Sequence, residues 1–478
     1  MSRIIPSLTR AARVAFTSTL LAAAPLAAQS VNTLPSDLSA RIDSAIDSVM
    51  RRSQVPSASV GIVRDGQVVY VRAFGKARLS PPVAASPEMH YAIGSISKQF
   101  TVAAAMLLVQ EGKLSLDDPV SKWLPELTRS NEVTLRNLMS HTSGYQDYAP
   151  QDYTIPAWTK PTTPQAIIHE WATKPLDFDP GTQYQYSNTN FNIVGLIVEK
   201  ASGQPFWSFL KSRVLDPVGL AHTIDLDTQH DQVEPIGYFR NALGPLRPAV
   251  LEAPGWYFAD GELAMPVSDL LRWDISVMNE TLLQHASYAA MEAPMKLKDG
   301  KEIGYGLGLS VGALGGHRMV SHGGEVGGFV SFNAVFPEDK MAVAVLTNQE
   351  ASPAAGAIGR SIATLLLSSS TTASADDAAP AEALARRVLS ELQHGQIDRA
   401  LFTSNGNFYF DRQAISDFAS SLSPLGEIRS LRQTSTNLRG GMRYRAFAVE
   451  FANGTRVNLS TYTTPDGKIE QFLVQPVT

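Results

Sequence analysis

The strongest constraint on the fold is a pair of strand-forming regions separated by a long, mainly helical stretch. Residues 59–63 and 68–71 flank Asp65-Gly66, a favoured pair for a tight hairpin turn. Strand patterns return after residue 300, over 305–311, 318–321, 329–336 and 341–347, whereas residues 95–273 read as helices and long loops. We therefore predict an α/β (α+β) fold with one antiparallel sheet, a large helical insert, and a crevice between the two that suits a site.

Composition excludes several classes of function. The 478 residues include no cysteine, so disulfides, thiol nucleophiles, Cys-ligated zinc and iron–sulfur clusters are ruled out. A net charge of -5 with no basic run argues against a nucleic-acid partner. The histidines show no His-Glu-x-x-His spacing, since His169-Glu170 lacks the second ligand, and we predict no metal and no cofactor.

The first 28 residues have the pattern of a signal peptide. Arg3, Arg10 and Arg13 precede an apolar run over 14–28, and no acidic residue occurs there. The run is short for a membrane span, and cleavage is expected near Ala28; an uncleaved N-terminal anchor is the alternative. We expect a periplasmic or extracellular protein with no stable membrane span after cleavage.

The remainder divides into two domains. The first domain is predicted over residues 29–367, and it begins with a helix over 38–52 capped by Ser36-Asp37. The next segment, 368–380, consists of small and polar residues and is predicted to be a linker. Residues 381–478 predict helices over 381–393 and 411–422, then strands separated by Gly440-Gly441, Asn453-Gly454 and Asp466-Gly467. This α+β unit resembles the cone-like folds of the cystatin and nuclear-transport-factor type. Its aromatic residues could line a pocket or form its core, and it could recruit substrate or mediate homo-oligomerisation.

Ser95-x-x-Lys98 is the first candidate for chemistry. Ser95 is expected to start a buried helix, where residues three apart share a face and Lys98 can lie beside the hydroxyl. Burial and the helix N-terminus lower the pKa of a lysine, and a neutral lysine can act as the base for a serine nucleophile. The alternative is a simple helix cap. Ser208-x-x-Lys211 has the same spacing, and we interpret it as an exposed helix face.

Two further polar clusters add to this one. In Tyr186-x-Asn188, a phenol stabilised as phenolate by a nearby ammonium could exchange protons, and Asn188 could bind an amide; the alternative is a helix cap with a packed tyrosine. In His322-Gly-Gly324-Glu325, glycines would let a substrate lie along a strand edge, and an N–H there could complete an oxyanion hole with Ser95. The alternative is a glycine-rich hairpin with a solvated histidine.

Together the three clusters resemble the motifs of the serine β-lactamase and penicillin-binding protein superfamily. The stretches over 111–119, 138–144 and 186–190 are similar to class C β-lactamases, D-amino-acid-specific peptidases and family VIII esterases. The resemblance covers residues 38–367 and implies a β-lactamase/transpeptidase-like fold. It also implies Ser95 as acylated nucleophile, Lys98 and Tyr186 as the proton-transfer pair, Asn188 as a ligand of the acyl amide, and the N–H groups of Ser95 and Glu325 as oxyanion donors.

One departure from the family pattern bears on the substrate. Class C enzymes have Lys-Thr-Gly where this chain has His322-Gly323-Gly324, so a permanent cation for a substrate carboxylate is missing, and His322 would be cationic only below about pH 6.5. We therefore expect a secreted serine hydrolase acting on a small-molecule or peptide substrate, a D-amino-acid peptidase or amidase. The alternatives are a family VIII-type carboxylesterase and an inactive binding or sensor protein of the same fold.

A competing motif lacks its context. Gly308-x-Ser310-x-Gly312 has the spacing of the nucleophile elbow of α/β-hydrolases, but an alternating strand surrounds it and no helix follows. We expect Ser310 to have no catalytic role.

Overall fold

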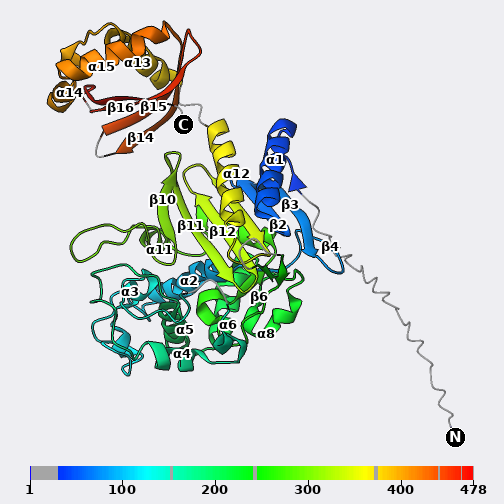
Figure 1. The fold of residues 1–478 in the computed structure, drawn as a ribbon. Helices are drawn as coiled ribbons and strands as arrows, with labels where there is room; N and C mark the ends of the chain where they lie inside the picture. Colours follow the sequence, from blue (N-terminus) through cyan, green and yellow to red (C-terminus); the bar gives the residue numbers. More distant parts are fainter. Residues whose placement is uncertain are drawn as a thin grey trace.

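The computed structural model describes Met1 and residues 31–150, 154–240, 245–370, 375–439, 442–464 and 466–476. Its central element is an eight-stranded antiparallel sheet of order β1-β3-β2-β13-β12-β11-β10, with β4 paired to β3 (Figure 1). Strands from both ends of the first domain are thus neighbours, as predicted. Their bounds are β1 (Val31–Asn32), β2 (Ser57–Arg64), β3 (Gln67–Arg78), β4 (Val83–Ala84), β10 (Ser310–Leu314), β11 (His317–Val326), β12 (Phe329–Phe336) and β13 (Met341–Thr347).

Side-chain alternation along the central strands gives the sheet two buried faces. Val343 and Val345 pack on the side covered by α1 (Ser36–Ser53) and α12 (Ala354–Ser370). The residues that alternate with them, Ala344 and Leu346, point to the opposite face and pack into the larger core, which also contains the helices of residues 95–291. A strand buried on both faces needs a continuous apolar run rather than strict alternation, which explains the uninterrupted apolar sequence of β13.

The helical half lies against the second face of the sheet and below it in Figure 1. Its long helix α2 is buried over most of its circumference, as expected for a helix with few polar positions. The elements are α2 (Ser97–Gln110), α3 (Leu135–Met139), α4 (Pro164–Trp171), α5 (Asn188–Ser202), α6 (Phe206–Leu210), α7 (Asp216–Val218), α8 (Leu226–Gln229), α9 (Phe258–Gly261), α10 (Val267–Met278) and α11 (His285–Met291), with short strands β5 (Tyr91–Ala92), β6 (Ile224–Asp225), β7 (Tyr238–Phe239), β8 (Arg247–Pro248) and β9 (Leu263–Met265).

The C-terminal residues form a second α+β unit with its own core of buried apolar side chains. A four-stranded antiparallel meander of order β14-β15-β16-β17 is covered by helices, coloured orange to red in Figure 1. The elements are α13 (Ala375–Gln393), α14 (Ser404–Tyr409), α15 (Arg412–Leu422), β14 (Ile428–Arg439), β15 (Met442–Phe451), β16 (Arg456–Thr463) and β17 (Ile469–Pro476). This layout agrees with the pattern of residues 381–478, apart from α14, which that pattern does not indicate.

Several boundaries differ from the sequence-based expectation. The strand expected over 305–311 begins only at Ser310, because Gly308 turns the chain at φ +71° to pass close to the backbone of Lys98. The strand expected over 318–321 continues to Val326 and includes the third motif. Helix α1 has Pro35 at its N-terminal boundary, with no side-chain cap, so the cap assigned to Ser36-Asp37 is wrong.

The structure describes part of the predicted linker but almost none of the predicted leader. Helix α12 ends at Ser370 and α13 begins at Ala375, so helix covers much of the segment predicted as a linker, and residues 371–374 lie outside the described residues. The leader predicted over 1–28 lies, apart from Met1, outside the described residues as well.

The close approach of α10 to β2 leads to a stability prediction. A Cβ at Gly61 would lie 2.7 Å from Leu271 Cδ1, whereas a Cβ at Gly312 in β10 meets nothing within 4 Å. Gly61→Ala should therefore lower the free energy of unfolding by about 1–3 kcal/mol through overpacking. Gly312→Ala, the control, should leave it unchanged or raise it slightly. Denaturant unfolding of both variants measures the difference, and equal stabilities would contradict the packing described.

Candidate active site

The motif residues meet in a cleft of about 720 Å³ between the helical half and β11. Segments far apart in the sequence line it: the turn before α2, the start of α5, the residues around α9, and β11. Six of the residues predicted from the sequence line the cleft, and Lys98 lies beneath them. The six are Ser95, Tyr186, Asn188, His322, Gly324 and Glu325. The structure thus brings together all seven residues singled out from the sequence.

Lys98 is the centre of the site. Its side chain is fully buried, and its Nζ donates to Ser95 Oγ at 2.9 Å, to Asn188 Oδ1 at 2.8 Å and to the backbone oxygen of Asp260 at 2.8 Å. Burial lowers the lysine pKa to about 8, while the carboxyls of Asp260 and Asp147 oppose that shift. At pH 7, about a tenth of the protein molecules then carry Lys98 in its neutral form.

Ser95 reaches Lys98 from a different element than expected. It lies in a 3₁₀ turn, Gly94–Ile96, and α2 begins only at Ser97. The three-residue spacing still places the hydroxyl beside the ammonium, because a 3₁₀ turn repeats every three residues.

Tyr186 differs from the sequence-based expectation in its ionisation. Its hydroxyl is buried and has no hydrogen-bond partner in the described part of the chain, and Lys98 Nζ lies 5.1 Å from the ring centroid, over the face. Burial raises the tyrosine pKa well above 10, an effect that Ser95 partly opposes. The expected stabilisation of a phenolate is therefore wrong for the free protein: the group is a neutral phenol.

Asn188 is held by both ends of its amide. Its Oδ1 accepts from Lys98, and its Nδ2 donates to Asp147 Oδ2 at 3.4 Å and to the backbone oxygen of Ala149 at 3.3 Å. Its backbone N–H donates to Asp147 Oδ1 at 2.9 Å. Asn188 is the first residue of α5, following Ser187 at the cap position, so it is not the helix cap. Its oxygen is a fixed acceptor for the lysine.

Asp260 is a site residue that sequence analysis missed. Its carboxylate accepts from Tyr148 Oη at 2.8 Å and from Asn192 Nδ2 at 2.7 Å, and burial raises its pKa to about 7 against the opposing charge of Lys98. Nothing in the local pattern of residues 256–261 marked it. Its role arises from α9 packing against α2 and α5, which is a tertiary property.

Two glycines allow the backbone of β11 to approach Ser95. Gly94 has φ +52°, and a Cβ there would lie 2.7 Å from the backbone nitrogen of Glu325. At Gly324 a Cβ would lie 1.8 Å from the backbone oxygen of Ile93. Strand β10 pairs with β11 only as far as Ser321, so the motif residues extend beyond that neighbour along the cleft. A side chain at either glycine would force Ser95 and Glu325 apart.

His322 belongs to a buried hydrogen-bond chain. The backbone N–H of Ser187 donates to His141 Nδ1 at 3.1 Å, His141 Nε2 contacts Tyr305 Oη at 3.2 Å, and Tyr305 Oη contacts His322 Nε2 at 2.9 Å. His322 Nδ1 lies against the backbone oxygen of Gly323, which can only accept. These partners fix the protons: His141 carries one on Nε2, Tyr305 donates to His322 Nε2, and His322 carries one on Nδ1.

The titration of His322 expected near pH 6.5 is therefore wrong. Burial, together with the charge of Lys98, lowers the His322 pKa to about 4, and burial lowers that of His141 well below 6.5. His322 is neutral at pH 7, with both ring nitrogens engaged by Tyr305 and Gly323.

The cleft is acidic. Five carboxyl groups line it, and the described residues of its wall include no lysine or arginine. Burial raises the pKa values of Glu252, Glu350 and Asp147, so these groups ionise at higher pH than usual. The five are Asp147, Glu252, Asp260, Glu325 and Glu350.

The competing serine motifs lie elsewhere. Ser208 and Lys211 are exposed at the end of α6, in agreement with the interpretation as a helix face. Ser310 begins β10, a strand, as expected for a serine outside a nucleophile elbow. Within the described residues, no cluster of three or more potential metal ligands occurs, and no helix there is long and apolar enough to cross a membrane.

Comparison with known proteins decides the family. The model of the family described as Beta-lactamase matches residues 42–367. The chain belongs to this family. It is 26% identical over 319 residues to a D-aminopeptidase of Gluconobacter oxydans, covering 65% of this chain and 59% of that protein. The chain thus spans less than two thirds of the length of that curated relative.

Two solved structures show how far the likeness extends. A D-stereospecific amidohydrolase from a Streptomyces species is 26% identical, with a TM-score of 0.59 over 67% of this chain and 96% of that one. An octameric penicillin-binding protein homologue from Pyrococcus abyssi is 23% identical, with a TM-score of 0.60 over 91% of this chain and all of that one. The expected fold and the expected family are therefore confirmed.

The buried state of His322 generates a test. In the unfolded chain its imidazole takes up a proton near pH 6.5, whereas in the folded protein it does so only near pH 4. The unfolded state therefore binds more protons between these values, and stability present above pH 6.5 is lost as pH falls towards 4. Relative to His322→Gln, the wild type should lose about 3 kcal/mol over this range, at about 1.4 kcal/mol per pH unit.

Denaturant unfolding of both proteins at several pH values measures this loss, with pH 8 as the baseline. A cationic histidine with a raised pKa would reverse the sign, making the wild type relatively more stable as pH falls through the same range.

Proposed function

We propose that this chain is a secreted hydrolase that forms an acyl-enzyme on Ser95 and cleaves D-aminoacyl amides or peptides with a free amino group. The observation that carries this proposal is the charge of the cleft, which has five carboxyl groups and no cation among the described residues of its wall. Such a cleft favours a substrate ammonium and disfavours the carboxylate of a β-lactam. The match to a D-aminopeptidase supports the same substrate class.

Acylation begins with the hydroxyl of Ser95. In the neutral form, Lys98 accepts its proton at Nζ, and Ser95 Oγ forms a bond to the substrate carbonyl carbon. The lowered lysine pKa supports this role, because a base must be unprotonated in part of the molecules at working pH. Asn188 Oδ1 and the Asp260 backbone oxygen keep Nζ aligned through the proton transfer.

Collapse of the tetrahedral intermediate breaks the amide C–N bond. The leaving amine needs a proton, and the neutral phenol of Tyr186 can supply it and recover one from Lys98. The oxyanion is stabilised by the N–H groups of Ser95 and Glu325, whose close approach depends on Gly94 and Gly324. Water then cleaves the ester at Ser95 by the reverse proton path.

Recognition of the substrate ammonium is assigned to Glu252 and Glu350. Both bind the glycine loop after the third motif, where Gly327 N donates to Glu252 and Gly328 N donates to Glu350. Both line the cleft that contains Ser95. A carboxylate already held by a backbone N–H is oriented in advance and loses little freedom when it binds an ammonium.

A carboxylesterase is the second candidate. The observation that favours it is the neutral His322, since an uncharged ester needs no cation at that position.

Secretion forms part of the main proposal and is supported by the leader pattern over residues 1–28. N-terminal sequencing of the protein recovered from outside the cytoplasm would test it, with a start near Gln29 expected.

The first prediction for this function concerns the nucleophile. Ser95→Ala and Lys98→Ala should abolish turnover of both D-alanine p-nitroanilide and p-nitrophenyl butyrate, because no acyl-enzyme forms. Tyr186→Phe should lower kcat at least ~100-fold, the scale for removing a general acid–base group. Ser208→Ala and Ser310→Ala are matched controls expected to keep full activity. An active Ser95→Ala protein would exclude this mechanism and, with it, both candidate functions.

The second prediction concerns the ammonium. D-alanine p-nitroanilide should have a higher kcat/KM than its N-acetyl derivative or the L enantiomer. Glu252→Gln should lower its kcat/KM about 10- to 100-fold while leaving p-nitrophenyl butyrate turnover nearly unchanged, because a charge-assisted contact contributes about 1.5–3 kcal/mol. Glu302→Gln, an exposed acid that pairs with Lys296, is the control.

The pH dependence follows from the raised carboxyl pKa values. As pH falls, Glu252 and Glu350 become neutral, so the preference for the free amine over its N-acetyl derivative should decrease. Above about pH 8 the substrate amine itself loses its proton and the preference should fall again. A faster reaction with the ester and no preference for the free amine would favour the carboxylesterase instead.

A further inference from the structure

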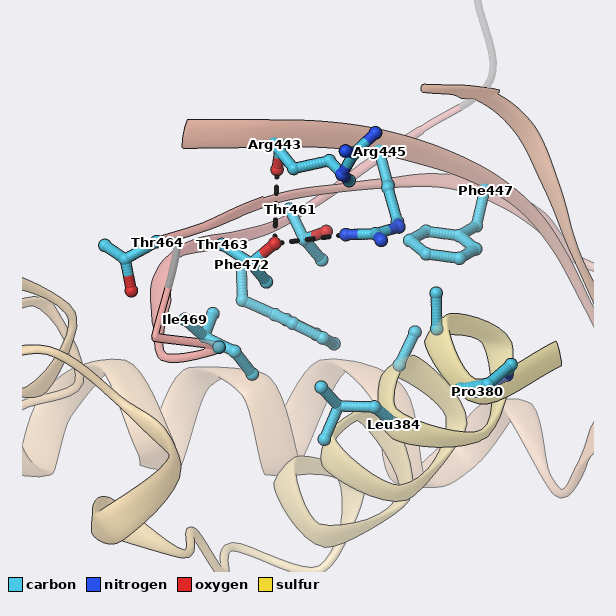
Figure 2. A pocket seen from close by; sticks show the side chains of 13 residues that line it. Pro380, Leu384, Arg443, Arg445, Phe447, Thr461, Thr463, Thr464, Ile469 and Phe472 are labelled. Carbon is cyan, nitrogen blue, oxygen red and sulfur yellow. Dashed lines mark hydrogen bonds between the residues drawn. The ribbon is translucent and has the colours of Figure 1, made fainter. Parts of the chain in front are cut away.

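The C-terminal unit contains a pocket that the proposed hydrolase does not use. Its volume is about 470 Å³, within the usual range of small-molecule sites. Figure 2 shows its position between the start of α13, which contributes Pro380 and Leu384, and one face of the sheet formed by β15, β16 and β17.

Strand alternation places two arginines on this face. Arg443, Arg445 and Phe447 are alternate residues of β15, so their side chains point to the same side of the sheet. Their partners across the ladder include Thr463, opposite Arg443, and Thr461, opposite Arg445. Two guanidinium groups and two hydroxyl groups therefore line the sheet side of the pocket.

The remaining wall is apolar. Phe447, Phe472 and Ile469 extend from the sheet, and Leu384 faces them from α13, as seen in Figure 2. Phe447, Phe472 and Ile469 are at most 2% exposed. The pocket thus combines a charged and hydroxylated part with a hydrophobic part, as a site for an amphipathic ligand requires.

The charge of the pocket is positive and lacks a lining carboxylate. None of the 13 described residues that line it is acidic. One Arg445 N–H donates to Thr463 Oγ1 at 3.0 Å, and the Thr463 hydroxyl lies 3.4 Å from the backbone oxygen of Arg443. The Arg443 guanidinium makes no hydrogen bond or ion pair with the described residues, and Thr461, 5% exposed, likewise has no partner for its hydroxyl among them.

We propose that this pocket binds a small organic carboxylate with an apolar tail. The planar guanidinium fork of Arg443 matches the two oxygens of a carboxylate, the charge of Arg445 adds to the attraction, and the Thr461 hydroxyl can donate a further hydrogen bond. The tail lies against Phe447, Phe472 and Leu384. Because every contact is made within residues 380–472, the inference is independent of the substrate of the hydrolase domain.

Calorimetric titration of the full chain with octanoate tests the proposal. Octanoate should bind, and 1-octanol and acetate, which carry only the tail or only the head group, should bind at least tenfold more weakly. The double variant Arg443→Gln/Arg445→Gln should weaken octanoate binding about 10- to 100-fold, the expected effect of removing charge-assisted hydrogen bonds. Hydrolysis of p-nitrophenyl butyrate should be unchanged in this variant.

Two controls keep the result decisive. Arg429→Gln removes an exposed arginine of β14 that pairs with Glu450, and it should bind octanoate as the wild type does. Arg443→Lys/Arg445→Lys keeps the charge and should retain part of the affinity, even if the glutamine variant is unstable. Octanoate binding that is unaffected by any arginine substitution, or that is equalled by 1-octanol, would overturn the proposal.

Discussion

The interaction on which the rest of the site depends is the buried ammonium of Lys98 with its three acceptors. These come from the turn before α2, from the start of α5 and from α9, so one side chain joins three elements of the helical half. An ammonium has three N–H donors, and all three are used. Removing one acceptor would leave a buried donor unsatisfied, which costs about 1–3 kcal/mol or more for a charged group. The geometry that prepares Ser95 therefore also stabilises the fold.

The same charge is coupled to two of the acids at the site, Asp260 and Asp147. Burial raises the pKa values of Asp260 and Asp147 and Lys98 opposes that rise, while the two carboxyls raise the pKa of Lys98 against the effect of its burial. The lysine thus remains close to the pH at which it can gain and lose a proton. Because Lys98 lies beneath the wall and the carboxyls reach the cleft, a substrate meets an acidic surface. In the proposed mechanism, one arrangement supplies both the base and the preference for a cation.

Sequence patterns predicted what depends on local periodicity and on motif spacing. The strands β12 and β13 were predicted to the residue, since apolar runs of that length are typical of buried strands. All motif residues meet in the cleft. Three site residues were not predicted from the sequence: Asp260, His141 and Tyr305. Each acts through a partner more than a hundred residues away or in another element, and no periodic pattern of the sequence indicates such a contact. The pKa values of Tyr186 and His322 were misjudged because burial disfavours the charged form of each group, and the depth of a side chain is a tertiary property.

The cleft around Ser95 and the pocket of the C-terminal unit differ in the charge of their described lining residues. The cleft around Ser95 has five carboxyls and no cation among its described wall residues, and the pocket of the C-terminal unit has two arginines and no acid. A carboxylate with an apolar tail is repelled by the first and attracted by the second, and an ammonium behaves in the opposite way. Under the two proposals, the sites therefore do not compete for one class of small molecule. Charge separation of this kind would let the C-terminal unit bind the proposed carboxylate while the proposed hydrolase site turns over its substrate.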